Sequence, residues 1–312
     1  MTVNAPAIHH NQSNYHEFVF KYLPENSKES FVSDLKCFSR FCRKVEINEN
    51  DLFDEVKQKE VGLAYFDYLY EQYARKTIER RMASLTKMIK IAKGNHYIPT
   101  YKTDVVIDKH MRLRLRQLPG ANQKTPLRLS DALGMKVLDN EATNKELRNQ
   151  VIVFMGLYSL CRASELLAIT PNDLDFDKKT IFIGRAKNDQ EGVGRFSPMS
   201  QRLKSLLQLY LSRRHFDPTK PLIRRLTKYD TLSTPLSYEG MYDCIKDICT
   251  KIYGVSTNYA THSLRIGAAV SMAENDVPLI EIIQAGGWKT STQPIHYTKQ
   301  ANTVNKGMGR LV

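Results

Sequence analysis

The feature that most constrains this chain is a break in its apolar pattern at residues 119–126, which read PGANQKTP. Pro and Gly punctuate secondary structure, and this stretch follows neither a helical nor a strand period. A chain of 312 residues is long for one hydrophobic core and suits two. We therefore expect two domains, residues 14–118 and 128–312, joined by a linker at 119–127 and preceded by a disordered tail at 1–13.

The first domain is predicted to be entirely helical. Apolar residues recur near 3.6-residue spacing from Phe31 to Phe41, and Ser27 precedes them as a candidate helix cap. Further helices are predicted at residues 57–72, 75–94 and 104–117. The second of these three would end at Gly94, a residue type that commonly terminates helices.

The second domain is predicted to be rich in helices, at residues 130–138, 145–160, 201–215, 238–252, 262–275 and 278–285. One region reads as β structure. It consists of short strands at 173–176, 180–184 and 195–199, separated by turn residues. The expected fold class is therefore mainly α, with a small three-stranded antiparallel sheet in the larger domain.

Positive charge is concentrated in one part of the chain. There are 46 Lys and Arg against 33 Asp and Glu, a formal net charge of +13. Between residues 72 and 128 there are 14 basic residues against 3 acidic ones, so an excess of 11 falls in less than a fifth of the sequence. An excess of this kind is typical of proteins that bind an anionic partner, with nucleic acid as the leading candidate.

The helix that begins at Arg75 carries much of this charge on the face opposite its apolar side. That face consists of Lys76, Arg80, Arg81, Ser84, Lys87 and Lys90. A charged helix face is usually no more than a solvated surface. Here the charge has a single sign with almost no carboxylates beside it, which favours a phosphate-binding face.

Cysteine usage and hydropathy exclude several other classes. The five cysteines form no CxxC pair and have no histidine at zinc spacing, so reduced core thiols and no metal site are expected. No signal peptide is visible, and the longest apolar stretch, Val151–Leu160, is about half of what a membrane span needs. We expect a cytoplasmic protein with no membrane partner.

Several residues of the second domain gain meaning only as an ordered set. Arg162 precedes Glu165 by one helical turn, and Lys187 lies at the tip of the predicted hairpin. Further along the chain are His262-x-x-Arg265, the single tryptophan, Trp288, and Tyr297. Each alone is ordinary, since RxxE pairs are common on helices, turn lysines are usually solvated and the chain has 16 tyrosines.

Taken in order, these residues resemble the catalytic set of the tyrosine recombinase family, and most of all its Cre-like members. The near matches are IGRAK at 183–187, HSLRIGAA at 262–269 and QAGGW at 284–288, with Tyr297 nine residues beyond. The resemblance covers the whole second domain. It extends more loosely over the first, which it identifies as a SAM-like core-binding domain. One departure from the wider family is Trp288, because most relatives carry His there.

The chemistry of phosphoryl transfer explains why these residue types belong together. Two guanidinium groups, Arg162 and Arg265, can clamp the non-bridging oxygens of a phosphodiester. His262 and the Trp288 indole N–H would add donors, which makes an oxyanion site without a metal. The resemblance implies that Tyr297 is the nucleophile, that Glu165 holds Arg162, and that Lys187 protonates the departing 5′-oxygen.

The resemblance also implies the product, the partners and the source. Attack by Tyr297 would give a 3′-phosphotyrosyl bond that stores the energy for strand exchange, so that no cofactor, metal or ATP is needed. The partner would be double-stranded DNA with an inverted-repeat recombination site. A homotetramer would form on two such sites, with residues 300–312 passing as a helix into a neighbour. The source would be bacterial, phage or plasmid.

The resemblance implies a DNA-reading role for two surfaces, with the basic helix from Arg75 in the major groove. On the basic helix, Arg80, Arg81 and Ser84 would face base edges, and Lys76, Thr77 and Lys87 would face phosphates. At the predicted start of the 238–252 helix, Glu239 stands where Cre-like proteins carry a base-reading arginine. Because Glu prefers the cytosine amino group to guanine acceptors, the recognised site is expected to differ there.

Rival interpretations stay open at this stage. Tyr259 is an alternative nucleophile, whereas His296 adjoins Tyr297 but would point about 100° away on a helix. A type IB topoisomerase would use the same residues without pairing two sites. A telomere resolvase would form hairpins, and a catalytically silent repressor would only bind DNA.

Overall fold

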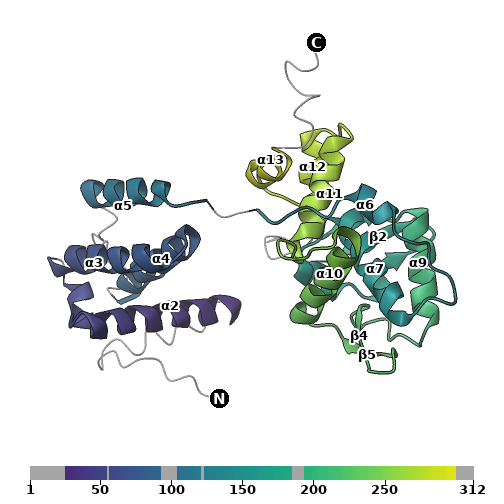
Figure 1. Cartoon of the computed structure of the whole chain (residues 1–312), viewed down its shortest axis with the longest axis horizontal. Coiled ribbons are helices and arrows are strands. Elements are labelled where there is room, and N and C mark those ends of the chain that lie inside the picture. Colours follow the sequence, from purple (N-terminus) through teal and green to yellow (C-terminus); the bar gives the residue numbers. More distant parts are fainter. Residues whose placement is uncertain (1–24, 55, 93–103, 121–122, 185–192, 300–312) are drawn as a thin grey trace, which may run out of the picture. The chain divides into compact units, whose positions relative to one another are not determined.

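The computed structural model describes residues 25–54, 56–92, 104–120, 123–184 and 193–299. The chain divides into two compact units, Met1–Asn122 and Gln123–Val312. The division lies inside the predicted linker (Figure 1). The predicted tail at 1–13, the C-cap at Gly94, the hairpin tip with Lys187 and the helix at 300–312 lie outside the described residues. No helix in the described ranges combines the length and apolar character needed to cross a bilayer.

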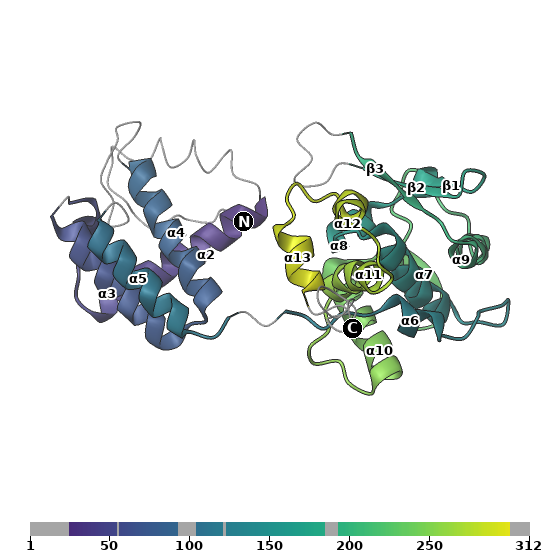
Figure 2. The ribbon, with the colours of Figure 1, turned by 90° about the horizontal axis from the view of Figure 1, so that it is seen from above.

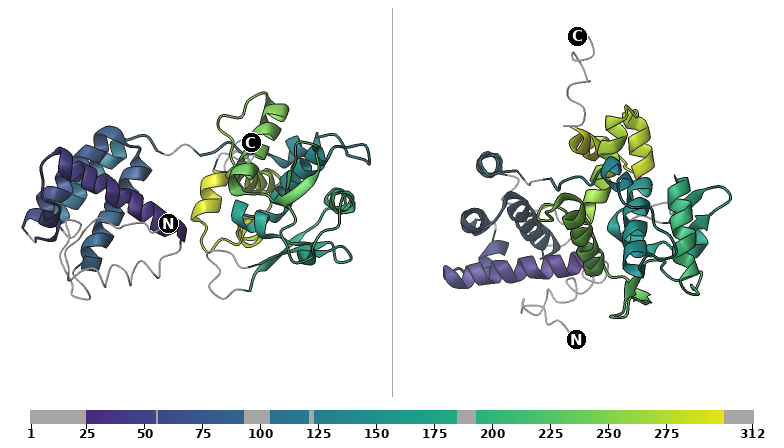
Figure 3. Two further views of the ribbon diagram at one scale, coloured as in Figure 1. Left: turned by 90° about the horizontal axis from the view of Figure 1, so that it is seen from below. Right: turned by 45° about the vertical axis from the view of Figure 1, so that its right-hand side comes forward.

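The first unit is a cluster of helices (Figure 3). Aromatic side chains are prominent in its core. Its elements are α2 (Glu25–Lys44), η1 (Glu49–Phe53), α3 (Lys57–Gln72), α4 (Arg75–Ala92) and α5 (Val105–Gln117). Phe38 packs edge-on against Tyr65 with ring centroids 5.1 Å apart, and Phe41 lies at the same distance from Tyr65. The 3.6-residue spacing of apolar residues puts all three rings on inward faces, which fixes α2 against α3.

The second unit contains the remaining helices and both sheets. Its helices are α6 (Leu129–Leu133), α7 (Asn144–Ser159), α8 (Ala163–Ala168), η3 (Pro171–Asp173), α9 (Gln201–Ser212), α10 (Tyr238–Tyr253), α11 (His262–Glu274), α12 (Leu279–Gly286) and α13 (Thr292–Thr298). α7 is the central helix of this unit, and nearly every residue from Leu147 to Ser159 is buried. Helices α9 and α11 both contact it (Figure 2).

The predicted three-stranded antiparallel sheet is present in the order β1 (Leu174–Asp175), β2 (Thr180–Ile183) and β3 (Arg195–Pro198). Within β2, Ile181 and Ile183 are buried, as the two-residue side-chain period of a strand requires. On the opposite face Phe182 pairs with Phe196 across the strands, with ring centroids 5.2 Å apart. The strands end within two residues of their predicted bounds.

Three local expectations were wrong. The chain has a second, two-stranded sheet of β4 (Arg224–Leu226) and β5 (Leu232–Pro235), which is too short and irregular to show a strand period. α6 ends at Leu133 rather than at Leu138, because Gly134 caps it after little more than one turn. α2 begins at Glu25, so Ser27 lies inside the helix and does not cap it.

Candidate active site

An open pocket of about 430 Å³ in the second unit gathers side chains from segments that are far apart in the sequence. The start of α8, helix α11, the α12–α13 connection and α13 all contribute to it. Helices α11, α12 and α13 contact one another in this unit (Figure 2). Its lining consists of Arg162, His262, Arg265, Trp288, Lys289, Thr290, Gln293 and Tyr297. Five of the predicted catalytic residues thus meet here, and the described part of the lining includes no carboxylate.

Helix α11 supplies two of these residues from a rigid position. His262 and Arg265 are three residues apart and so share one face of the helix. A Cβ on Gly267 would lie 1.7 Å from the Leu127 carbonyl oxygen, which shows that the helix backbone rests directly on that segment. The Leu127 N–H donates to the Ser263 carbonyl at 3.0 Å. Close packing against the Leu127 segment therefore fixes the position of α11, from which both side chains enter the pocket.

Helix α13 contacts α11 and brings Tyr297 to His262. The Tyr297 hydroxyl lies 2.7 Å from Nε2 of His262, which is hydrogen-bond distance. The Trp288 ring lies edge-on to the Tyr297 ring, with centroids 6.1 Å apart. The phenol is thus in contact with both an imidazole and an indole.

Arg265 is buried in the wall of the pocket, with 1% of its surface exposed. Its Nη1 donates to the carbonyl of Leu160, and its Nη2 donates to the carbonyl of Gly286 at 2.8 Å. The guanidinium carbon lies 4.0 Å from the centre of the Trp288 ring, a cation–π contact. These three contacts hold a flexible side chain in one orientation.

The two glycines before Trp288 explain how the indole reaches this position. Gly287 has φ = 61°, a left-handed conformation that ends α12 and reverses the chain. The backbone N–H of Trp288 then donates to the Ile283 carbonyl at 3.1 Å, which folds the indole back over the helix end. A Cβ on Gly286 would lie 1.9 Å from Cζ3 of Trp288, so no larger residue fits beneath the ring.

Arg162 enters the pocket from the N-terminus of α8 and is held by Glu165. Its Nη1 donates to Oε1 of Glu165 at 2.6 Å, and its backbone N–H donates to Oε2 at 3.1 Å. The Glu165 side chain is 4% exposed, whereas that of Arg162 is 27% exposed. The buried carboxylate thus orients a guanidinium that is still open to the pocket.

Burial and the arginines control the proton affinities in the site. Burial lowers the pKa of His262 below its ordinary value of 6.5, and Arg265 and Arg162 lower it further. Burial raises the pKa of Tyr297, and the same two arginines partly oppose this. Burial also raises the pKa of Glu165, but hydrogen bonds from Arg162 and nearby positive charge outweigh it, so the net pKa is lowered. At neutral pH the site therefore holds a neutral imidazole beside a protonated phenol.

Sequence reasoning missed Arg195, the first residue of β3. Its Nε donates to the Ala285 carbonyl at 3.1 Å and its Nη2 to the Ser159 carbonyl at 3.0 Å. Nη1 and Nη2 each lie 3.5 Å from Oε2 of Glu165. An arginine at the start of a short strand is usually solvated, so nothing local in the sequence distinguishes this residue.

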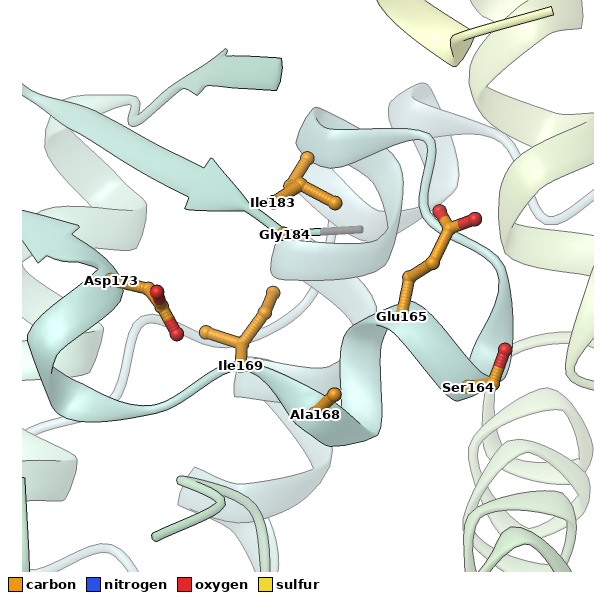
Figure 4. Close-up of a pocket in the computed structure, with 7 residues that line it drawn as sticks. All are labelled: Ser164, Glu165, Ala168, Ile169, Asp173, Ile183 and Gly184. Carbon is orange, nitrogen blue, oxygen red and sulfur yellow. The ribbon is translucent and has the colours of Figure 1, made fainter. Parts of the chain in front are cut away.

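The other predicted residues of this unit lie elsewhere. Tyr259 is buried and stacks on Tyr253 with ring centroids 4.9 Å apart, so it does not line the pocket. His296 and Glu239 are exposed and are also outside the lining. Lys187 belongs to residues 185–192, which the structure does not describe. The strand that leads to it, β2, ends at a smaller pocket beside Glu165 (Figure 4).

In the first unit, the exposed side of α4 carries Lys76, Arg80 and Lys87, with Thr77 and Ser84 partly exposed. A buried carboxylate from α2 organises this side. Asp34 is 2% exposed, and it accepts from Arg80 Nη1 at 2.5 Å and from Ser84 Oγ at 2.8 Å. Asp34 thus holds Arg80 and Ser84 on the predicted basic face, whereas Lys76 pairs with Glu79 of the same helix at 3.0 Å.

Arg81 differs from its predicted neighbours on this face. Its side chain is 12% exposed, and its guanidinium lies 3.9 Å from the centre of the Tyr73 ring and 3.5 Å from Asp34. A helix of 3.6 residues per turn puts residues 80 and 81 about 100° apart, and that rotation turns Arg81 inward.

The chain is similar to known recombinases and integrases. Residues 135–303 match the phage integrase family. The chain is 24% identical over 298 residues to an integrase/recombinase XerD homolog of Selenomonas ruminantium, covering 90% of this chain and 84% of that protein. It is 25% identical over 192 residues to the Cre recombinase of Escherichia phage P1, covering 56% of each.

Solved structures share the fold. The Tn1549 transposon integrase in complex with transposon right-end DNA has a TM-score of 0.63 at 16% identity, covering 96% of this chain and 98% of that one. A lambda integrase dimer bound to a COC′ core site has a TM-score of 0.62 at 12% identity, covering 93% and 96%.

The family match spans more than half of the chain and includes every residue that the sequence analysis assigned to the chemistry. The chain therefore belongs to the phage integrase family and is a tyrosine recombinase, a DNA strand-transferase.

Proposed function

We propose that this protein is a Cre-like site-specific recombinase that exchanges strands between two DNA sites through a 3′-phosphotyrosyl intermediate, without metal or ATP. The observation that carries the proposal is the 2.7 Å contact between the Tyr297 hydroxyl and His262 Nε2, in a pocket that two arginines line. This arrangement pairs a nucleophile with a proton acceptor beside a site for a phosphodiester.

In the first step the Tyr297 oxygen attacks the scissile phosphorus while its proton moves to Nε2 of neutral His262. Arg162 and Arg265 bind the non-bridging oxygens, because a guanidinium has five N–H donors and Arg265 uses two on backbone carbonyls. The indole of Trp288 holds the Arg265 guanidinium and can donate its N–H to the phosphate. A tryptophan cannot shuttle protons, so acid–base work falls to other residues.

The bond to the 5′-oxygen of the next nucleotide breaks as the phosphotyrosyl bond forms, and Lys187 supplies the proton that this oxygen takes up. A free 5′-hydroxyl from a second duplex then reverses the step. Because the covalent bond retains the energy of the phosphodiester, strand exchange needs no external energy source.

For binding, we propose that α4 faces double-stranded DNA at an inverted-repeat site. Arg80 and Ser84 would contact base edges, and Lys76, Thr77 and Lys87 would contact phosphates. Arg81, whose side chain is mostly buried, would not contact the DNA itself and would instead hold Asp34 and Tyr73 in place. Glu239 at the start of α10 would read a cytosine, so that Glu239→Arg should change the preferred target sequence.

We further propose that four copies assemble on two sites, with residues 300–312 passing into a neighbour, and that the protein acts on DNA in the cytoplasm. Truncation after Lys299 should leave binding to a single site intact and abolish cooperative pairing of two sites. Analytical ultracentrifugation of the protein–DNA complexes tests this, and unchanged recombination by the truncated protein would overturn it.

The decisive experiment traps the covalent intermediate. The protein is incubated with candidate target sites nicked next to the scissile phosphate, so that the freed end diffuses away and the adduct accumulates. Tyr297→Phe should bind the DNA and form no adduct, whereas Tyr259→Phe, which removes a hydroxyl outside the pocket, should still form it. A two-site exchange assay then separates recombination from simple relaxation of supercoils. An adduct that survives in Tyr297→Phe would overturn the proposal.

A further inference from the structure

Two arginines join the same two helix ends through neighbouring carbonyl groups. Arg265 donates to Leu160 and Gly286, and Arg195 donates to the residue before each of them, Ser159 and Ala285. All four carbonyls lie at the C-terminal ends of α7 and α12, where backbone acceptors have no partner within the helix. The two side chains therefore connect the C-terminal ends of α7 and α12 by two parallel pairs of hydrogen bonds.

Both helix ends have conformations that need such support. Leu160 has φ = 49°, in the left-handed region that a non-glycine residue seldom adopts. Gly287 at the end of α12 also has a left-handed φ of 61°. These two turns place Arg162 and Trp288 in the pocket, since Arg162 is the second residue after Leu160 and Trp288 directly follows Gly287.

Arg195 also approaches the third element of the site. Its Nη1 and Nη2 lie 3.5 Å from the Glu165 oxygen that accepts from the Arg162 backbone N–H. The Arg195 side chain is 15% exposed and does not line the pocket. It thus contacts the carbonyls next to those that hold Arg265 and the carboxylate that holds Arg162, without reaching the place where a phosphate would bind.

We propose that Arg195 is a positioning residue for transition-state stabilisation: it fixes α7, α8 and α12 so that Arg162 and Arg265 face the scissile phosphate together. This inference rests on the proposed function. A lysine at this position keeps the charge but has one nitrogen in place of a planar fork, so it cannot join Ser159, Ala285 and Glu165 at once.

A rival role would act through the proton donor. Arg195 begins β3, which pairs with β2, and Lys187 lies in the segment that connects these strands. Ile183 and Gly184 at the end of β2 line the same small pocket as Glu165 (Figure 4). If Arg195 only anchored this hairpin, its loss would impair proton delivery and leave the phosphate-binding arginines in place.

The test compares full-length wild type with Arg195→Lys in single-turnover cleavage of a nicked target site. Two versions of the site are used, one with a normal scissile phosphate and one with sulfur in place of the 5′-bridging oxygen. A thiol has a pKa of about 8.5 and leaves without a proton donor, whereas binding of the non-bridging oxygens is still needed.

We expect Arg195→Lys to bind DNA as wild type does and to cleave the normal site on the order of 10- to 100-fold more slowly, as for a small misplacement of catalytic groups. The same deficit should persist on the sulfur-substituted site. A matched control is Arg202→Lys, because Arg202 likewise donates to backbone carbonyls away from the site, those of Leu133 at 2.8 Å, Met135 at 2.6 Å and Lys136 at 3.5 Å. That variant should cleave at the wild-type rate.

Each other outcome decides against the proposal. Wild-type cleavage by Arg195→Lys would show that the hydrogen bonds of Arg195 are dispensable. A loss of cleavage rate that vanishes on the sulfur-substituted DNA would assign Arg195 to proton delivery. Thermal melts of Arg195→Lys and Arg195→Gln are run beside the assay. If neither is folded at the assay temperature, Arg195 serves the fold alone. Absence of any wild-type adduct would instead refute the proposed function.

Discussion

Replacing Gly286 with alanine perturbs the site by a single methyl group. The added Cβ would lie 1.9, 2.2 and 2.6 Å from three atoms of the Trp288 ring. A rigid indole cannot relieve this by moving one distal atom, so the whole ring has to shift or the helix end has to deform.

The size of the shift follows from these distances. Ordinary contact begins at 3.4 Å, so Cζ3 has to move by about 1.5 Å. The ring now lies 4.0 Å from the Arg265 guanidinium, and Gly286 itself accepts from Arg265 Nη2 at 2.8 Å. A misplacement of about 1 Å can cost 100-fold in rate, so we expect cleavage to fall by about that factor. Overpacking should lower stability by about 1–3 kcal/mol.

The measurement is single-turnover adduct formation on a nicked site, with DNA affinity and melting temperature determined in parallel. Gly134→Ala is the matched control, because Gly134 also ends a helix with ordinary backbone angles and an added Cβ would meet its nearest neighbour at 3.4 Å. Wild-type cleavage by a folded Gly286→Ala protein would refute the argument that the indole position governs Arg265.

Three further predictions concern titratable groups. Because the pKa of His262 lies below 6.5, the cleavage rate should be flat around neutral pH and fall only in more acidic buffer, and His262→Gln should lose this limb along with about 100- to 10,000-fold of the rate in a pH–rate series. The stability that Glu165 contributes through its lowered pKa is complete above its ordinary pKa of 4.5 and is lost as the pH falls below it. Glu165→Gln should therefore be less stable by on the order of 3 kcal/mol at pH 7. Its free energy of unfolding, measured with urea, should also fall less steeply than that of wild type as the pH drops below 4.5. Asp34→Asn frees Arg80 from its internal partner, so that its charge can pair with a DNA phosphate. In anisotropy titrations the plot of log binding constant against log salt concentration should become steeper by up to about 0.9, and the preference for the specific site should weaken. An unchanged slope and preference would count against the role of Asp34.

The sequence alone predicted the features that depend on neighbours within a turn or two of chain. Apolar spacing located α3, α7 and α11 to within a residue or two, and the predicted start of the 104–117 helix falls at Asp104, which the structure shows to be the N-cap of α5. The ordered motif selected Arg162, His262, Arg265, Trp288 and Tyr297, and the structure brings all five into one pocket. Apolar spacing depends on near neighbours in the chain, and the motif is recognised from the order of its residues, so neither requires knowledge of the tertiary structure.

Contacts that join distant segments were decided only by the tertiary structure. Arg195 meets the Ala285 carbonyl 90 residues away, and Asp34 meets Arg80 46 residues away. Neither side chain looks unusual among its sequence neighbours, because its partner is set by how helices pack and not by any local period. The direction of Arg81 was decided in the same way, since a charged helix face cannot reveal which of its cations an internal carboxylate and an aromatic ring will hold.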